Sequence, residues 1–258
     1  MVDLYDYSLM TIAVLGLAVI LGASEVGWQF GTRSGGRGGD NISTLESATL
    51  GLLALIIGFT FAMALSRFES RRDAIVNEAN AIGTTALRAR LLPQPHRTET
   101  LNLLREYVQL RLEVIESGRS LAELRPFVDR SNAIQEALWQ RAKAVAAIDN
   151  GMVPTGLFIL TLNEMIDDQS KRLAALRNRV PNVVLLGLFG IAAVAGGFAG
   201  YASGRDPKRS RLPVYIMGLV VFSVIFLILD LDRPSNGFIR NDQQPMIDTA
   251  AAIAAFTD

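Results

Sequence analysis

Four long stretches without a charged residue constrain the fold of this chain more than any other feature. They comprise residues 7–24, 47–66, 180–204 and 212–229. A membrane-spanning helix needs about 20 mostly apolar residues, because the hydrocarbon core is about 30 Å thick and each helical residue rises 1.5 Å. We therefore predict four transmembrane helices that form two hairpins, with a long segment inserted between helices 2 and 3.

The first apolar stretch has the length of either a signal peptide or a retained helix. A signal peptide begins with basic residues, whereas this chain begins "MVDLYDY", with two acids and no base. No convincing small-x-small cleavage site precedes the glycine-rich loop that follows. We therefore expect a retained transmembrane helix.

Composition excludes several classes of function. The 25 basic and 25 acidic residues balance, so no basic surface for nucleic acid is indicated. The chain has no cysteine and one histidine, His96, which we expect in an exposed loop. Thiolate sites, histidine metal sites and nucleotide-binding loops are all missing from the sequence. We predict no enzyme activity, no cofactor and no metal.

The inserted segment, residues 67–180, has the apolar periodicity of helices. Transmembrane helix 2 is expected to continue past Arg67 until "LLPQP" ends it near residue 92. Further helices are expected over about 98–116, about 126–148 and from about Pro154 to Val180. The predicted fold is all-α, with an antiparallel four-helix bundle attached to a four-helix membrane domain.

These boundaries define four regions. Residues 1–66 form the first transmembrane hairpin, 67–180 the extramembrane bundle, 181–233 the second hairpin, and 234–258 a C-terminal tail. The hairpin loops are rich in arginine and lysine, which favours cytoplasmic loops and an extracytoplasmic bundle. Arginines at the membrane ends of the bundle favour the reverse. The first orientation is preferred, and the second stays open.

Polar residues near the membrane ends are candidates for an ion pathway. Glu46, in "STLE", could line a pore mouth, or it could complete a capping box with Ser43. The other candidates could form a polar vestibule, or they could fix the register of the bundle through buried hydrogen bonds. These other candidates are Asn77, Glu78, Asn80, Asn163, Glu164 and Asp167.

Basic residues cluster where the bundle meets the membrane. They could anchor the chain at lipid headgroups, or they could form an electropositive ring that concentrates anions. These residues are Arg67, Arg71, Arg72, Arg172, Arg177 and Arg179. Separately, Gly196, Gly200 and Gly204 repeat every four residues, which is typical of close helix packing in membranes.

The last transmembrane helix ends in "LDLDRP". Asp230 and Arg233 are three residues apart and can meet on one helix face. We interpret Asp230, Asp232 and Arg233 as a structural clasp that joins the C-terminal tail to the basic residues near the membrane. Substitution of Asp232 by alanine should then loosen the assembly.

Three blocks of the sequence resemble a known family. They are residues 43–95, which begin "STLESATLGLLALIIG", the block "LNEMIDDQSKRLAALRNRVP", and the block "LDLDRPSNGFIRNDQQPMID". Together they resemble the bestrophin-like family of membrane proteins, which is common in bacteria. The resemblance extends from Ser43 to Ile247. It places the chain in the bacterial inner membrane as a multi-pass protein.

The resemblance implies an oligomeric ion channel. Bestrophins are pentameric chloride channels, so the expected partners are further copies of the chain, small inorganic ions and membrane lipids. The run of acids that bestrophins use for calcium is not present after Asp232, so calcium gating is not implied. The alternative is a non-conducting structural or sensory membrane protein whose helical bundle binds a partner.

Overall fold

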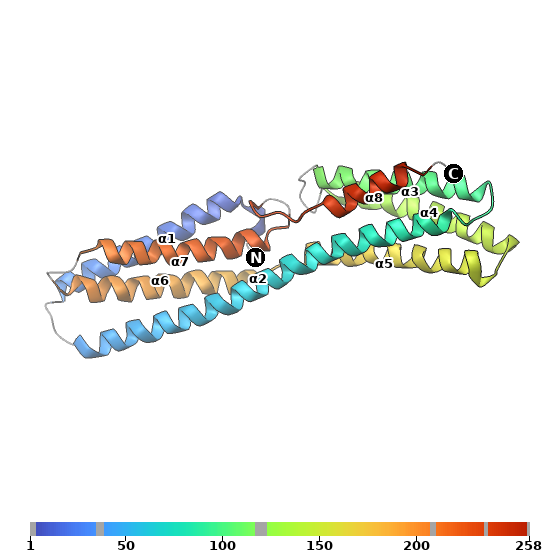
Figure 1. Ribbon diagram of the computed structural model, residues 1–258. Helices are drawn as coiled ribbons and strands as arrows, with labels where there is room; N and C mark the ends of the chain where they lie inside the picture. Colours follow the sequence, from blue (N-terminus) through green and yellow to red (C-terminus); the bar gives the residue numbers. More distant parts are fainter. Residues whose placement is uncertain (1–3, 35–38, 117–122, 207–209, 235–236, 257–258) are drawn as a thin grey trace. The chain divides into compact units, whose positions relative to one another are not determined.

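The computed structural model describes residues 4–34, 39–116, 123–206, 210–234 and 237–256. The described elements are helical (Figure 1). In chain order they are η1 Leu4–Asp6, α1 Leu9–Arg33, α2 Gly39–Ala89, α3 His96–Glu116, α4 Arg125–Ile148, η2 Met152–Gly156, α5 Leu157–Arg177, α6 Asn182–Gly204, α7 Leu212–Asp232 and α8 Gln244–Ala254. The chain divides into two compact units, and α2 passes through both.

Unit 1 comprises residues 1–67 and 179–239. It contains α1, the first part of α2, α6 and α7, and Figure 1 shows these helices running alongside one another. Ser8 caps α1 by accepting a hydrogen bond from the Thr11 backbone N–H at 3.0 Å. By length and composition, α1, α2, α6 and α7 supply the four candidate membrane spans of the described residues. The fold is thus all-α with four transmembrane helices, as the sequence predicts.

The closest packing in unit 1 is between α1 and α6. A Cβ atom added to Gly200 would lie 2.0 Å from the backbone oxygen of Ser24, and one added to Gly204 would lie 2.4 Å from that of Trp28. A Cβ atom on Gly27 would lie 2.1 Å from the backbone oxygen of Gly197. Only glycine permits this approach, so the glycines of both helices set the distance between their axes. Successive contacts advance along both helices together, so α1 and α6 run parallel.

Large apolar side chains cover the outer faces of unit 1. Only 17% of the apolar stretch of α2 is buried within the chain. Its Leu52, Leu55 and Phe59 are 49%, 54% and 66% exposed. A soluble monomer does not present so much apolar surface, whereas a membrane protein presents it to lipid or to another subunit.

Unit 2 comprises residues 68–178 and 240–258. The second part of α2 packs with α3, α4, α5 and α8 around one apolar core. The core includes Ile82, Leu104, Leu138 and Leu162, each at most 1% exposed. These side chains recur at three- and four-residue intervals along their own helices, which is why the sequence predicts helices α2 to α5 well.

Three local expectations are corrected. The predicted tail contains α8, whose Met246, Ala250 and Ile253 are buried in the core of unit 2. Helix α2 already begins at Gly39, so Ser43 lies inside the helix and cannot cap it. His96 is the first residue of α3 rather than part of a loop. Lys208 and Arg209, in the basic loop between the last two spans, lie outside the described residues.

Candidate functional site

A buried ionic cluster lies in the middle of unit 2. Glu78, on α2, is fully buried and contacts arginines from two other helices. Its Oε1 lies 2.8 Å from Nε of Arg111 on α3, and its Oε2 accepts a hydrogen bond of 2.6 Å from Arg172 on α5. Both arginines are at most 5% exposed. Three helices are therefore joined through a single carboxylate.

Neutral polar side chains extend this cluster to α4. The hydroxyl of Tyr107, on α3, donates to Glu78 Oε1 at 3.1 Å and lies 3.1 Å from Oε1 of Gln169 on α5. Gln135, on α4, donates its amide hydrogen to the same oxygen of Gln169. A buried polar group costs free energy unless it is hydrogen-bonded, and these partners meet that requirement. We call these six residues the Glu78 cluster.

The electrostatics of the Glu78 cluster keep its carboxylate charged. Burial alone would raise the pKa of Glu78, but the charges of Arg111 and Arg172 hold that pKa below its usual range. Burial together with the charge of Glu78 raises the pKa of the Tyr107 hydroxyl. The carboxylate is thus already paired with two guanidinium groups. It is not available as a ligand for a cation, and the described residues contain no group of acids and histidines arranged for a metal ion.

The other polar candidates lie on the surface of unit 2. Asn77 and Asn80 are exposed on α2, although Glu78 between them is buried. Asn163, Glu164 and Asp167 are exposed on α5. Register-fixing hydrogen bonds inside the bundle therefore come from the Glu78 cluster and not from these five residues. Glu46, on the membrane part of α2, is partly exposed.

The predicted basic ring contains residues of two kinds. Arg72 and Arg177 are exposed in unit 2, as a ring that attracts anions would require. Arg172, by contrast, belongs to the buried Glu78 cluster, and Arg71 is only 2% exposed. These two arginines are therefore not surface residues, which corrects the expectation that they contact headgroups or free anions.

In unit 1, Arg67 and Arg179 are partly buried. The guanidinium carbon of Arg179 lies 4.6 Å from the centre of the Tyr5 ring. This is a cation–π distance. Arg179 thus holds the N-terminal turn against the start of the third span.

The end of α7 carries a second buried polar cluster, within unit 1. Asp232 is fully buried and accepts hydrogen bonds from the Val180 backbone N–H, at 2.9 Å, and from the Tyr5 hydroxyl. Burial, followed by the hydrogen bond to Asp232, raises the pKa of Tyr5 above its usual range. The carboxylate therefore joins the N-terminal turn, Val180 just before α6 and the end of α7.

Asp230 and Arg233 complete this cluster. Asp230 accepts hydrogen bonds from the backbone N–H groups of Phe238 and Ile239, at 2.6 and 2.9 Å, and so folds the chain back after α7. Arg233 donates to the backbone oxygen of Tyr7 at 2.7 Å. Asp230, Asp232 and Arg233 thus contact the N-terminal turn, Val180 and the segment after α7. Their pairing with Arg67, Arg71 and Arg72 stays a prediction.

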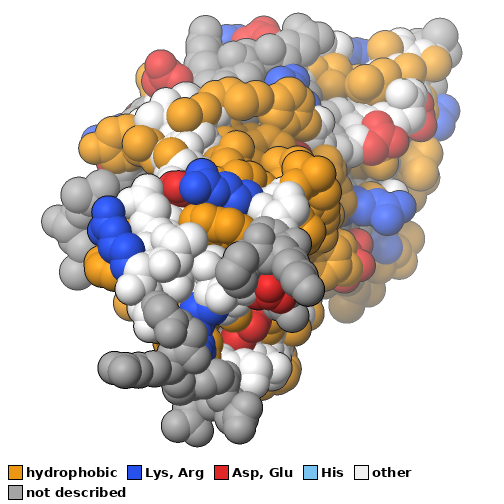
Figure 2. Space-filling model, turned by 90° about the vertical axis from the view of Figure 1, so that its left-hand side faces the viewer, with side chains coloured by type: hydrophobic (Ala, Val, Ile, Leu, Met, Phe, Trp, Pro, Cys, Tyr) orange, Lys and Arg blue, Asp and Glu red, His pale blue; other side chains and the backbone are white. Residues whose placement is uncertain are grey.

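The opposite end of unit 1, at the basic hairpin loops, also carries Glu25, which sequence reasoning did not single out. Glu25, on α1, accepts hydrogen bonds from Arg211, at 3.2 Å, and from the hydroxyl of Tyr215 on α7. The guanidinium carbon of Arg211 lies 5.3 Å from the centre of the Trp28 ring. Figure 2 looks onto this end, where basic side chains (blue) lie beside hydrophobic ones (orange). Such mixed aromatic and basic surfaces are typical of a membrane–water interface.

The model of the Bestrophin-like domain family matches residues 42–246. Solved structures of a bacterial bestrophin homolog from Klebsiella pneumoniae have the same fold. A tryptophan-to-alanine mutant of that protein aligns with a TM-score of 0.70 at 17% identity, over 96% of this chain and 97% of that one.

A second structure of the Klebsiella protein, phased with zinc, aligns with a TM-score of 0.66 at 17% identity over 95% of each chain. A search of curated protein sequences gives no match. The family match covers most of the chain, including three of the four candidate membrane spans, the Glu78 cluster and the end of α7. This multi-pass membrane protein therefore belongs to the Bestrophin-like domain family.

Proposed function

We propose that this chain is the subunit of a homo-oligomeric ion channel that conducts anions across the bacterial inner membrane. The observation that carries the proposal is membership of the Bestrophin-like family over residues 42–246. The shared fold with a bacterial bestrophin homolog, over 95% or more of the chain, supports it. By resemblance to bestrophins, the first expectation for the assembly is a pentamer.

The surface of unit 1 is consistent with assembly. The apolar side chains of α2 that this chain leaves exposed need a covering of lipid or of further copies. Oligomeric membrane proteins bury such faces between subunits by close van der Waals packing. Native mass spectrometry of the detergent-extracted protein should give a mass five times that of the 28.0 kDa chain.

Two exposed arginines of unit 2 are consistent with conduction of anions. Arg72 and Arg177 are exposed. Side chains of one sign along a water-filled path raise the local concentration of the opposite ion. The exposed Asn77, Asn80 and Asn163 offer further polar groups to such a path. Negative charge would repel anions at the narrowest part of the path. We therefore propose that Glu46, Glu164 and Asp167 lie away from that part.

Chloride release from liposomes tests the proposal. Vesicles loaded with potassium chloride and carrying the purified oligomer are diluted into potassium gluconate of equal osmolarity, and external chloride is recorded. A chloride path should give fast release only after valinomycin provides a parallel path for potassium. Vesicles without protein supply the baseline. Absence of release with valinomycin, from protein shown to be folded and oligomeric, would refute chloride conduction. Absence of flux of any small ion would refute the channel and favour a structural or sensory role.

A further inference from the structure

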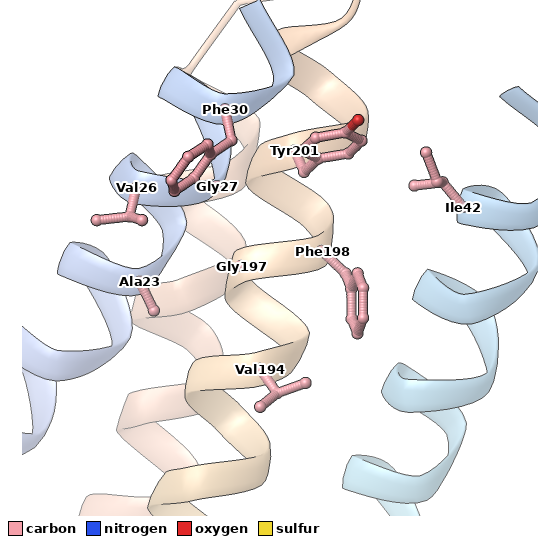
Figure 3. A pocket seen from close by; sticks show the side chains of 9 residues that line it. All are labelled: Ala23, Val26, Gly27, Phe30, Ile42, Val194, Gly197, Phe198 and Tyr201. Atoms are coloured by element: carbon pink, nitrogen blue, oxygen red, sulfur yellow. The ribbon is translucent and has the colours of Figure 1, made fainter. Parts of the chain in front are cut away.

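An apolar pocket opens between α1, α6 and α2 in unit 1. Its volume is about 590 Å³, within the range of small-molecule sites. Figure 3 shows Val26 and Phe30 of α1 and Phe198 and Tyr201 of α6 around it, with Ile42 of α2 on the far side. Apart from the Tyr201 hydroxyl, the lining side chains are hydrocarbon.

The glycine contacts between α1 and α6 form the floor of the pocket. Gly27 and Gly197 both line it, and they bring the two backbones together. Because neither residue has a side chain at the crossing, the surface between the helices stays recessed. The larger side chains on either side, Phe30 and Phe198, then become its walls. The glycines that let the helices pack also leave a groove along their seam.

One end of this pocket is basic. Arg33 lies three residues after Phe30 on α1, and Arg205 lies four residues after Tyr201 at the end of α6. Residues at these spacings share a helix face. Because α1 and α6 run parallel, both arginines lie at the same end of the pocket, on the side of the hairpin loops.

Arg33 and Arg205 differ from Arg211, the other arginine at this end of unit 1. Arg211 forms an ion pair with Glu25 and lies over the ring of Trp28. Among the described residues, the buried Nε of Arg205 has no hydrogen-bond partner, and its guanidinium carbon lies 6.0 Å from the centre of the Tyr201 ring. Arg33 is exposed. Arg205 is only partly exposed, and one of its donors is unfilled among the described residues, at the basic end of the pocket.

We propose that this pocket binds one acyl chain of an anionic phospholipid, with the lipid phosphate against Arg205 and Arg33. The pocket belongs to a membrane-spanning unit, where hydrocarbon surrounds the helices. Basic pockets between transmembrane helices favour anionic headgroups, and a phosphate fills the hydrogen-bond donors of a guanidinium.

Native mass spectrometry tests this proposal. The full-length protein is released from nanodiscs that contain phosphatidylglycerol and phosphatidylcholine with identical chains, and the retained lipids are counted. The wild-type protein should retain phosphatidylglycerol in preference to phosphatidylcholine. Ala23→Phe, which fills the pocket from α1, should reduce retention about tenfold, roughly what burial of two methylene groups is worth. Arg205→Gln should keep a bound lipid but lose the preference for phosphatidylglycerol.

Matched variants separate binding from folding. Ala18→Phe makes the same change at an exposed position of α1 outside the pocket and should retain lipid like the wild type. Val194→Phe narrows the same pocket from α6, so it replaces Ala23→Phe if that variant does not fold. Equal retention in the pocket variants and Ala18→Phe would overturn the proposal, as would an unchanged headgroup preference in Arg205→Gln. An oligomer that dissociates in Ala23→Phe with lipid retention unchanged would assign the pocket to a second copy.

Discussion

Glu78 is the residue on which the interior of unit 2 depends most. Its carboxylate is the shared acceptor of Arg111 and Arg172, and all three side chains are almost completely buried. Removing one partner of a buried ion pair leaves an uncompensated charge, which costs about 3–5 kcal/mol. Glu78→Gln, which keeps the shape but removes the charge, should therefore lower the melting temperature of the purified protein markedly.

Glu164→Gln is the matched control for this change. It makes the same chemical substitution on α5, where the side chain is exposed. A surface change of this kind should alter the free energy of unfolding by less than about 0.5 kcal/mol. Similar melting temperatures for the two variants would show that the buried carboxylate contributes little.

The low pKa of Glu78 gives this effect a definite pH dependence. A carboxyl whose folded pKa is depressed stabilises the fold fully above its unfolded pKa, about 4.3 for glutamate. That stability is lost as the pH falls through the lower, folded pKa. The difference in melting temperature between the wild type and Glu78→Gln should thus be constant from about pH 5 to 8 and shrink below about pH 4. A difference that already shrinks near pH 6 would contradict a depressed pKa.

Asp232 plays a comparable part in unit 1. It supplies the acceptor for the Val180 backbone N–H and the Tyr5 hydroxyl, which come from distant parts of the chain. Asp232→Ala leaves both donors buried without this acceptor, which costs about 1–3 kcal/mol for each. We expect a lower melting temperature and a less stable oligomer in size-exclusion chromatography. Asp248→Ala, at an exposed position of α8, should change neither. Unchanged behaviour of Asp232→Ala would refute its role as a clasp.

The polar residues of the Glu78 cluster could have been found from the apolar pattern. Glu78 lies between Ile75 and Ile82 on the buried face of α2, and Arg111 follows Val108 by three residues on α3. A charged residue at a core position must have a buried partner. Which helices supply that partner depends on how they pack, and the spacing along one helix does not contain this information.

At the scale of elements, the contact between α1 and α6 makes the sharpest prediction. In Gly200→Ala the new methyl group would lie 2.0 Å from the Ser24 backbone oxygen, so the helices must separate. Overpacking of this kind costs about 1–3 kcal/mol, and more where a backbone must move. Thermal unfolding in detergent should show the loss.

Gly190→Ala, on the same helix, is the control for this prediction. A Cβ atom there meets nothing within 4 Å. The change should be neutral or slightly stabilising, because alanine favours helix over glycine. Equal melting temperatures for the two alanine variants would show that α1 and α6 are not in close contact.

Elements with a long apolar pattern were predictable, and α8 was not. The four spans and α3 to α5 each contain several turns of regular apolar spacing, which local sequence reveals directly. Helix α8 has 11 residues, most of them small and apolar around Ala250, and follows an irregular segment. Its stability comes from the groove of unit 2 that buries Met246 and Ile253, so only tertiary packing identifies it.

For the whole molecule, the order of apolar runs was sufficient to predict a four-span membrane protein with an inserted helical bundle. The sequence could not assign residues 240–258 to the second unit, because that depends on contacts between α8 and helices far away in the chain. It likewise does not fix the orientation in the membrane, since the basic residues of the loops and of the bundle favour opposite sides.

The charge of the exposed arginines should determine which ions the assembled molecule conducts. Arg72 and Arg177 are exposed, so replacing both by glutamine removes positive charge without disturbing the core. Because an electropositive entrance raises the local concentration of anions, the double variant should show a lower permeability ratio of chloride to potassium in planar bilayers. The effect should be largest at low ionic strength, where charges are screened least. Lys143→Gln, an equally exposed change on α4, should leave the ratio as it is. A double variant with unchanged selectivity at every salt concentration would remove these arginines from the ion pathway and leave the selectivity to residues inside the membrane.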